Sequence, residues 1–174
     1  MSKDYPDSIN PLKAAQGGRR FSGTLPLARL HRLHDVAADP ERGEFAFQLS
    51  FCLDEYGNVR AELGVSGELN LVCQRSLKTY AQPIESHSVL GIVTDERAAE
   101  ALPEDYEPLL IQEWRLRIED VIAEEILLSL PLVPRAPDSC PVSAGPAAAP
   151  KTYKPFAELA ELAAKADTDP FKQE

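Results

Sequence analysis

The three histidines are the first residues to consider for catalytic chemistry, because a nucleophilic mechanism needs a base beside a serine or cysteine and a third group that orients the base. His31 and His34 lie in a basic stretch, and His87 lies in a segment with strand periodicity. The chain has no Gly-x-Ser-x-Gly motif, the turn that presents a nucleophilic serine. We interpret the histidines as surface or capping residues and expect no enzyme activity.

Adjacent carboxylates form the second candidate group. They recur within residues 95–125 as Asp95-Glu96, Glu104-Asp105, Glu119-Asp120 and Glu124-Glu125. General acid–base catalysis needs one carboxyl group that is desolvated and has a raised pKa. The side chains of sequence neighbours diverge, and these pairs lie among many other charges. The pattern is therefore typical of a solvated acidic face.

Cysteine usage gives the third candidate. Cys73-Gln-Arg-Ser76 contains half of a C-x-x-C zinc knuckle, whereas structural zinc takes four nitrogen or sulfur ligands in tight local pairs. Cys52, His87 or Cys140 would complete such a set only by coincidence. We expect neither a metal nor a cofactor, and we interpret Cys73 as a buried residue at a strand end. The odd total of three cysteines also argues against a secreted disulfide scaffold.

A basic element near the N-terminus is the fourth candidate. Residues 1–42 carry seven Lys or Arg against five acids, although the whole chain has a net charge of −10. Clustered cations of this kind contact phosphates, and a solvated helix face is the open alternative. The candidates for phosphate contacts are Arg19, Arg20, Arg29 and Arg32, together with Arg75 further along the chain.

Strict alternation of apolar and polar residues identifies the element most clearly predicted. Residues 44–54 read as a half-buried strand with its phenylalanines, Phe45, Phe47 and Phe51, on one face. A turn at residues 55–58 and renewed alternation over residues 59–65 predict a hairpin.

Further strands are expected on both sides of this hairpin. A turn at Ser66-Gly67 separates the hairpin from the next strand, and Pro83 interrupts the later ones at an edge or a bulge. The expected additional strands are residues 19–25, 69–73, 79–84 and 87–93, with extended segments at 109–111 and 114–116.

Helical spacing marks three segments. Pro26 begins a short amphipathic helix that ends near Asp35, and Thr94 is the expected N-cap of a helix reaching Leu102. The strongest helix spans residues 118–130. Its apolar stripe is Ile118, Val121, Ile122 and Ile126, broadened by Leu128 and Leu130, before Pro131 and Pro134 stop it.

These elements predict an α+β fold. We expect an antiparallel, twisted sheet of about five strands, with barrel-like curling left open, covered by the C-terminal helix and flanked by extended termini. Residues 1–18 are predicted to be a weakly packed N-terminal arm, residues 19–135 one domain, and residues 136–174 a flexible Pro/Ala-rich tail with a short terminal helix.

The N-terminus has no apolar signal-peptide core, and no apolar run approaches the roughly 20 residues that span a bilayer. We therefore expect a cytoplasmic protein with no membrane association.

Four motifs together resemble the YceD family of bacterial large ribosomal RNA subunit accumulation proteins. They are Cys73-Gln-Arg, the run from Asp95 to Pro108, the run Glu124-Glu-Ile-Leu-Leu-Ser-Leu-Pro-Leu-Val-Pro134, and Cys140, and Lys154-Pro-Phe-Ala-Glu-Leu159 resembles the terminal segment of that family. The resemblance implies a non-enzymatic role in the synthesis, processing or accumulation of 23S ribosomal RNA. That family usually has C-x-x-C where this chain has Cys73 and Ser76.

Two binding hypotheses follow. In the first, the protein is a ribosome-assembly factor that binds precursor 23S rRNA or a large-subunit assembly intermediate through the arginines named above. In the second, it is an acidic chaperone for a basic ribosomal protein or processing enzyme, because residues 95–125 carry eleven acids and three bases. The candidate partner-binding residues are Glu104, Asp105, Glu107, Phe156 and Leu159; the last two lie on an apolar face that docks a partner groove or packs loosely on its own domain.

Overall fold

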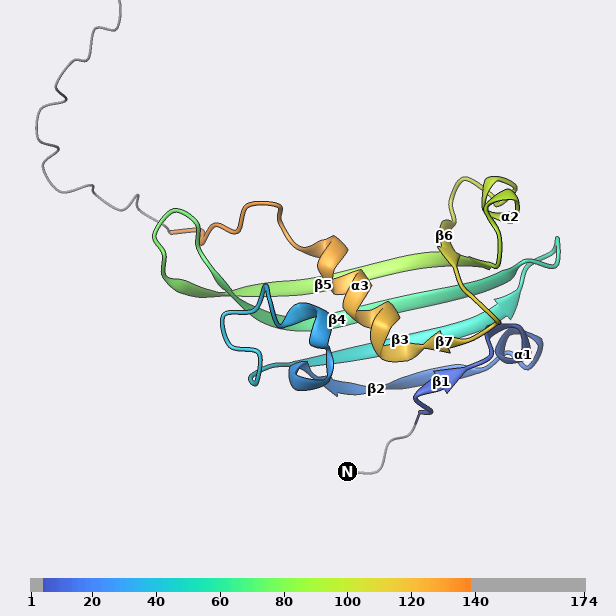
Figure 1. The fold of residues 1–174 in the computed structure, drawn as a ribbon, viewed down its shortest axis with the longest axis horizontal. Helices are drawn as coiled ribbons and strands as arrows, with labels where there is room; N and C mark the ends of the chain where they lie inside the picture. The colour runs from blue at the N-terminus through green and yellow to red at the C-terminus, as the bar shows by residue number, and fades with distance from the viewer. Residues whose placement is uncertain (1–4, 139–174) are drawn as a thin grey trace, which may run out of the picture. The chain divides into compact units, whose positions relative to one another are not determined.

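The computed structural model describes residues 5–138, and its main element is a five-stranded sheet with the order β2-β3-β4-β5-β6 (Figure 1). Its strands are β2 (Arg20–Pro26), β3 (Glu44–Leu53), β4 (Val59–Val72), β5 (Thr79–Val93) and β6 (Glu107–Leu110). A separate antiparallel pair joins β1 (Ser8–Ile9) to β7 (Leu116–Arg117). The helices are α1 (Pro11–Gln16), α2 (Glu96–Glu100) and α3 (Ile118–Ser129), with 3₁₀ turns η1 (Leu27–Arg29) and η2 (His31–Leu33).

The α+β prediction is confirmed, and the barrel-like alternative is wrong. Strands β2 to β5 are antiparallel, but β6 pairs in parallel with the end of β5. Strands β2 and β6 stand at opposite edges, so the sheet is open within residues 5–138.

The alternation in β3 produces the core as predicted. Phe45, Phe47, Leu49 and Phe51 are buried, and the residues between them are exposed or half-buried. Helix α3 lies across this apolar face of the sheet (Figure 1). Ile118, Ile122 and Ile126 of its predicted stripe are fully buried, whereas Leu128, in the last turn of the helix, is exposed.

The predicted turn at Ser66-Gly67 is wrong, because β4 continues through it as one strand of 14 residues. Odd-numbered residues point to the core from Val59 to Leu71, so the alternation never changes phase. Gly67 is required by packing: a Cβ there would lie 2.6 Å from Cδ1 of Phe45. The two strands predicted on either side of Pro83 are likewise one strand, β5, and Pro83 pairs with Glu68 at a position where β5 has no second neighbour among the described strands.

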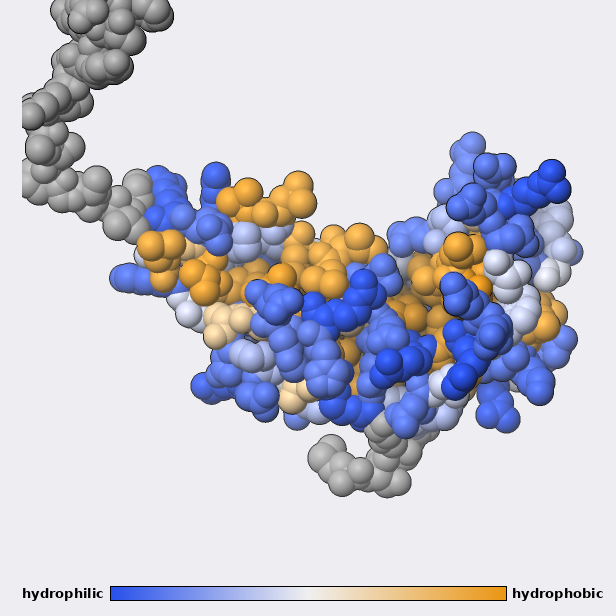
Figure 2. Space-filling view, in the orientation of Figure 1, coloured by the Kyte–Doolittle hydropathy of each residue, from blue (hydrophilic) through white to orange (hydrophobic). Residues whose placement is uncertain are grey.

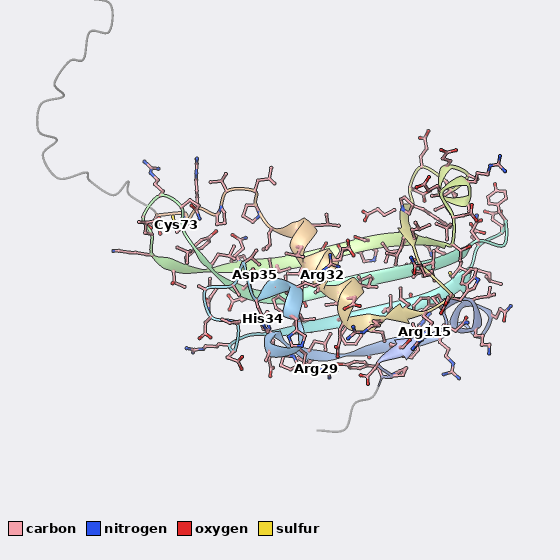
Figure 3. All side chains as sticks on the ribbon, viewed as in Figure 1. Arg29, Arg32, His34, Asp35, Cys73 and Arg115 are labelled. Carbon is pink, nitrogen blue, oxygen red and sulfur yellow. The ribbon has the colours of Figure 1, made fainter. Side chains whose placement is uncertain are left out.

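The predicted amphipathic helix after Pro26 is instead the two 3₁₀ turns. Leu27, Leu30 and Leu33 are all buried, and their spacing of three matches the 3₁₀ repeat better than the α repeat. Arg29 and Arg32 occupy the outer side of these turns and face α3 (Figure 3).

The weak packing predicted for residues 1–18 is wrong for residues 5–18. Asn10 caps α1 by accepting a hydrogen bond of 3.0 Å from the Lys13 N–H, and Pro11 occupies its first turn. The buried Tyr5 ring meets the Phe47 ring edge-on at 5.0 Å between centroids. The proline and glycine content that indicated an extended arm here supplies a helix start and a turn.

Two local predictions around α2 and β7 also need correction. Asp95, not Thr94, is the N-cap of α2, and its side chain accepts a hydrogen bond of 2.9 Å from the Ala98 N–H. Glu113 and Trp114 have positive φ values of 52° and 50°, so the segment predicted to be extended contains a left-handed turn.

Candidate functional site

The five arginines predicted to contact RNA do not form one site. Arg19 and Arg20 follow α1, where Arg20 pairs across the sheet with Ser50 and its neighbour Glu62. Arg75 lies in the β4–β5 hairpin tip, beyond Val72. The ten residues of strand between Glu62 and Val72 separate the two places by about 33 Å. A single phosphate cluster would not bridge that distance.

Arg29 and Arg32 are brought together, but their partners are carboxylates of α3 (Figure 3). The Arg29 guanidinium forms an ion pair with the Glu119 carboxylate and lies 3.5 Å from the Asp7 carboxylate. The Glu119 carboxylate also lies 3.8 Å from the Arg117 guanidinium. Arg32 pairs with Glu124 at 3.1 Å. Two of the seven cations of residues 1–42 are therefore paired with carboxylates of the acidic block, residues 95–125.

The first part of the acidic block, residues 95–107, has its acidic side chains exposed. Residues 95–107 carry six acids and one base, and none of these side chains makes an ion pair within residues 5–138. Glu104, Asp105 and Glu107 are all exposed. Figure 2 shows a hydrophilic lobe over α2 at one end of the sheet. We call residues 95–107 the acidic lobe.

The acidic lobe is held on the sheet by its half-buried side chains, Leu102 and Tyr106. Leu102 and Tyr106 fill the space above Gly91 of β5, where a Cβ would lie 2.5 Å from Leu102. The Tyr106 hydroxyl donates to Asp54 over 3.4 Å, and the Arg60 guanidinium lies 5.9 Å from the Tyr106 ring centre. These contacts fix the position of the lobe and leave its carboxylates in solvent.

Two pKa shifts accompany this attachment. Burial raises the pKa of Tyr106, and the negative charge of Asp54 adds to the shift. Burial also disfavours the charged form of Asp54, but hydrogen bonds from Asn58 and Tyr56 outweigh it and lower the pKa of Asp54. Asp54 therefore remains an anion that fixes the β3–β4 turn and the lobe together.

A buried carboxylate lies on the core side of α3. Glu125 is 5% exposed, and its Oε1 accepts hydrogen bonds from the hydroxyls of Ser86 and Ser88, the second at 2.6 Å. The prediction of a solvated acidic face is therefore wrong for Glu125. The sequence signal that separates it from Glu124 is its position, one turn after Val121 on the buried stripe.

Cys73 is fully buried and directly follows β4, as predicted. The hydrogen bond from the Ser76 hydroxyl lowers the pKa of the Cys73 thiol to about 6; burial opposes this shift, and the Ala136 N–H, 3.3 Å from the sulfur, adds to it. Cys52 lies in β3 and Cys140 lies outside the described residues. Among residues 5–138, no cluster of His, Cys, Asp and Glu is arranged to hold a metal ion.

The histidines are separated from these carboxylates and thiols. The rings of His31 and His34 meet edge-on at 5.0 Å, and Nε2 of His34 lies 3.3 Å from the Leu27 carbonyl oxygen. His87 is exposed on the uncovered face of the sheet, opposite Gly64. Phe156 and Leu159, predicted to bind a partner, lie outside the described residues.

Comparison with known proteins decides the family. The family model of the large ribosomal RNA subunit accumulation protein YceD matches residues 61–172. This chain belongs to the YceD family. It is 30% identical over 169 residues to the large ribosomal RNA subunit accumulation protein YceD of Haemophilus influenzae, covering 92% of this chain and 97% of that relative. No solved structure matches this chain.

Family membership assigns the protein to the accumulation of large-subunit ribosomal RNA. The family resemblance predicted from the Cys73, Asp95–Pro108 and Glu124–Pro134 motifs is confirmed. Within residues 5–138 no helix has the length and apolar character needed to cross a membrane.

Proposed function

We propose that this YceD protein is a non-enzymatic ribosome biogenesis factor that supports 23S rRNA accumulation by binding a basic protein of the large-subunit pathway through its acidic lobe. The partner class is a basic ribosomal protein or an rRNA-processing enzyme. The proposal rests on family membership for the pathway and on the charge distribution for the mode of action.

The observation that carries the binding mode is the unequal use of the acidic block. The carboxylates of α3 are engaged by Arg29, Arg32, Arg117 and two serines, whereas the six acids of residues 95–107 face solvent on a fixed support. A concentrated patch of one sign steers an oppositely charged partner and raises its association rate.

The test is crosslinking in cells with a photoreactive residue at Glu104, followed by mass spectrometry after ribonuclease treatment. The expected product joins residue 104 to a named ribosomal or rRNA-processing protein with a surplus of Lys and Arg. Recovery of RNA alone, or of no protein from that pathway, would contradict the proposal. A photoreactive residue at Glu85, exposed on the uncovered sheet face, serves as the matched control.

Direct RNA binding is the second candidate, and the exposed arginines favour it. Arg19, Arg20 and Arg75 make no ion pair within residues 5–138, in contrast to Arg29 and Arg32. Gel-shift titration of 23S fragments distinguishes the two sets. If the exposed arginines contact phosphates, added salt should weaken RNA binding. The double substitution Arg19→Glu with Arg20→Glu should weaken it as well. Binding that is unaffected by salt or by these changes would exclude that role.

A further inference from the structure

Exposed apolar side chains gather at the end of the sheet away from the acidic lobe. Leu132 is fully exposed, Leu128 is 73% and Leu77 is 68% exposed, and Val72 and Val133 are also exposed. Figure 2 shows hydrophobic side chains over the end of α3 and the neighbouring hairpin. These five make up more than half of the nine large apolar side chains exposed in residues 5–138. Such clustering is typical of an interaction surface.

Two chain segments are joined at this place by two hydrogen bonds, one between backbone groups and one to a side-chain sulfur. The Gln74 N–H donates to the Pro134 carbonyl over 2.9 Å, and the Ala136 N–H donates to the Cys73 sulfur over 3.3 Å. Pro131 and Pro134 restrict the backbone on either side of Leu132 and Val133. The backbone that carries Leu132 and Val133 is therefore restrained before any partner binds, which lowers the backbone entropy lost on binding.

The charge of this surface is opposite to that of the whole chain. Residues 72–78 and 127–136 contain Arg75, Lys78 and Arg135 and no acidic residue, whereas the chain carries −10. All three cations are exposed. We call these two segments the cationic apolar surface.

We propose that the cationic apolar surface docks an amphipathic helix of a partner protein whose apolar face is flanked by acidic residues. The apolar side chains match a helix face, and the three cations match its acidic flanks. RNA fits less well, because phosphates would pair with the cations and leave Leu128 and Leu132 in water.

The partner at this surface differs in charge from the basic protein proposed for the acidic lobe. The two surfaces lie at opposite ends of the sheet, with the β4–β5 hairpin at one end and α2 with β6 at the other (Figure 1). Strand β4, with 14 residues, separates them by about 45 Å. One chain thus holds two chemically different proteins at a set separation, which is the action of an adaptor.

The test uses the full 174-residue chain and a fluorescent synthetic peptide of about 18 residues, roughly five helical turns. The peptide has a leucine face flanked by glutamates, and its matched counterpart has lysines in place of the glutamates. Fluorescence anisotropy gives both dissociation constants, and amide chemical shifts locate the binding site. The glutamate peptide is expected to bind at residues 72–78 and 127–136 more tightly than the lysine peptide.

Substitution provides the second readout. Leu132→Ser with Val133→Ser is expected to weaken the glutamate peptide by about tenfold or more, because both side chains lose apolar burial. Leu110→Ser, an exposed leucine of β6, is the matched control and should leave the affinity unchanged. Circular dichroism checks that each variant is folded.

Four results would overturn the proposal: stronger binding of the lysine peptide, shifts located elsewhere, equal effects of the two variants, or tighter binding of a single-stranded RNA to the same residues. A photoreactive residue at Leu132 in cells adds a direct check. Crosslinks to acidic helical segments of other proteins are expected. Crosslinks only to RNA, to a second copy or to residues beyond 138 of the same chain would contradict the assignment.

Discussion

Gly64 and Gly67 lie on the same strand of this YceD protein, and the structure predicts opposite effects of replacing each with alanine. At Gly67 the new Cβ would lie 2.6 Å from Cδ1 of Phe45 and 2.7 Å from the Glu44 carbonyl oxygen. The backbone oxygen has little freedom to move, so the strand pairing or the Phe45 rotamer must shift. At Gly64 the nearest neighbour is Cδ2 of His87 at 4.0 Å, which is ordinary contact.

The magnitudes follow from overpacking and from backbone entropy. Forcing an extra carbon into a packed core costs about 1–3 kcal/mol, and the lower entropy loss of alanine returns about 0.5–1 kcal/mol in a strand. We predict that Gly67→Ala destabilises the protein by about 2 kcal/mol and that Gly64→Ala stabilises it by about 0.5 kcal/mol.

Urea unfolding followed by circular dichroism measures both effects. For a domain of this size the dependence on urea is about 1–3 kcal/mol per molar, so Gly67→Ala should lower the midpoint by about 1 M. A Gly67→Ala midpoint at or above that of the wild type would refute the reasoning. It would mean that Phe45 does not lie over residue 67 and that β3 and β4 pair in another register.

Three further predictions concern the buried and paired groups. Glu125→Ala should lower the free energy of unfolding by about 2–4 kcal/mol, because it leaves the hydroxyls of Ser86 and Ser88 without their acceptor, and Glu125→Gln should cost less in the same urea assay. Arg32→Ala should cost less than about 1 kcal/mol, because its pair with Glu124 is about half exposed; a larger loss would show that this pair supports α3. The pKa of the Cys73 thiol is lowered from its ordinary value of 9.0 to about 6. Ionisation of this thiol therefore contributes no stability below about pH 6 and contributes increasingly as the pH rises toward 9.0. The free energy of unfolding of the wild type should rise relative to that of Cys73→Ser over this interval, and parallel pH profiles of the two proteins would contradict the shift.

The sequence was informative where one physical pattern acts alone. Alternation in residues 44–54 predicted β3 and its buried phenylalanines, and the apolar stripe of residues 118–130 predicted α3. The sequence also indicates that the two predicted strands are one strand, β4, because every core-facing position from Val59 to Leu71 is odd-numbered. Ser66-Gly67 indicates a turn by residue type, whereas the role of Gly67 in the structure is to accommodate Phe45.

The division of the acidic block could not be predicted in the same way. Arg29 and Arg32 meet carboxylates that are 90 and 92 residues later in the chain. Only the packing of η1 and η2 against α3 creates those pairs, and a charge count along the sequence does not contain it. The cationic apolar surface arises similarly, since Gln74 and Pro134 are neighbours only after the β4–β5 hairpin forms.

We infer that the exposed acids of the acidic lobe support 23S rRNA accumulation. This role is tested by the ratio of 23S to 16S rRNA in cells whose only YceD protein carries Glu104→Gln, Asp105→Asn and Glu107→Gln. The matched control carries Glu41→Gln, Glu68→Gln and Glu85→Gln, which change the net charge equally at exposed positions elsewhere. We expect a lower ratio with the acidic-lobe variant and a normal ratio with the control. A normal ratio with both variants, at wild-type protein levels, would contradict it.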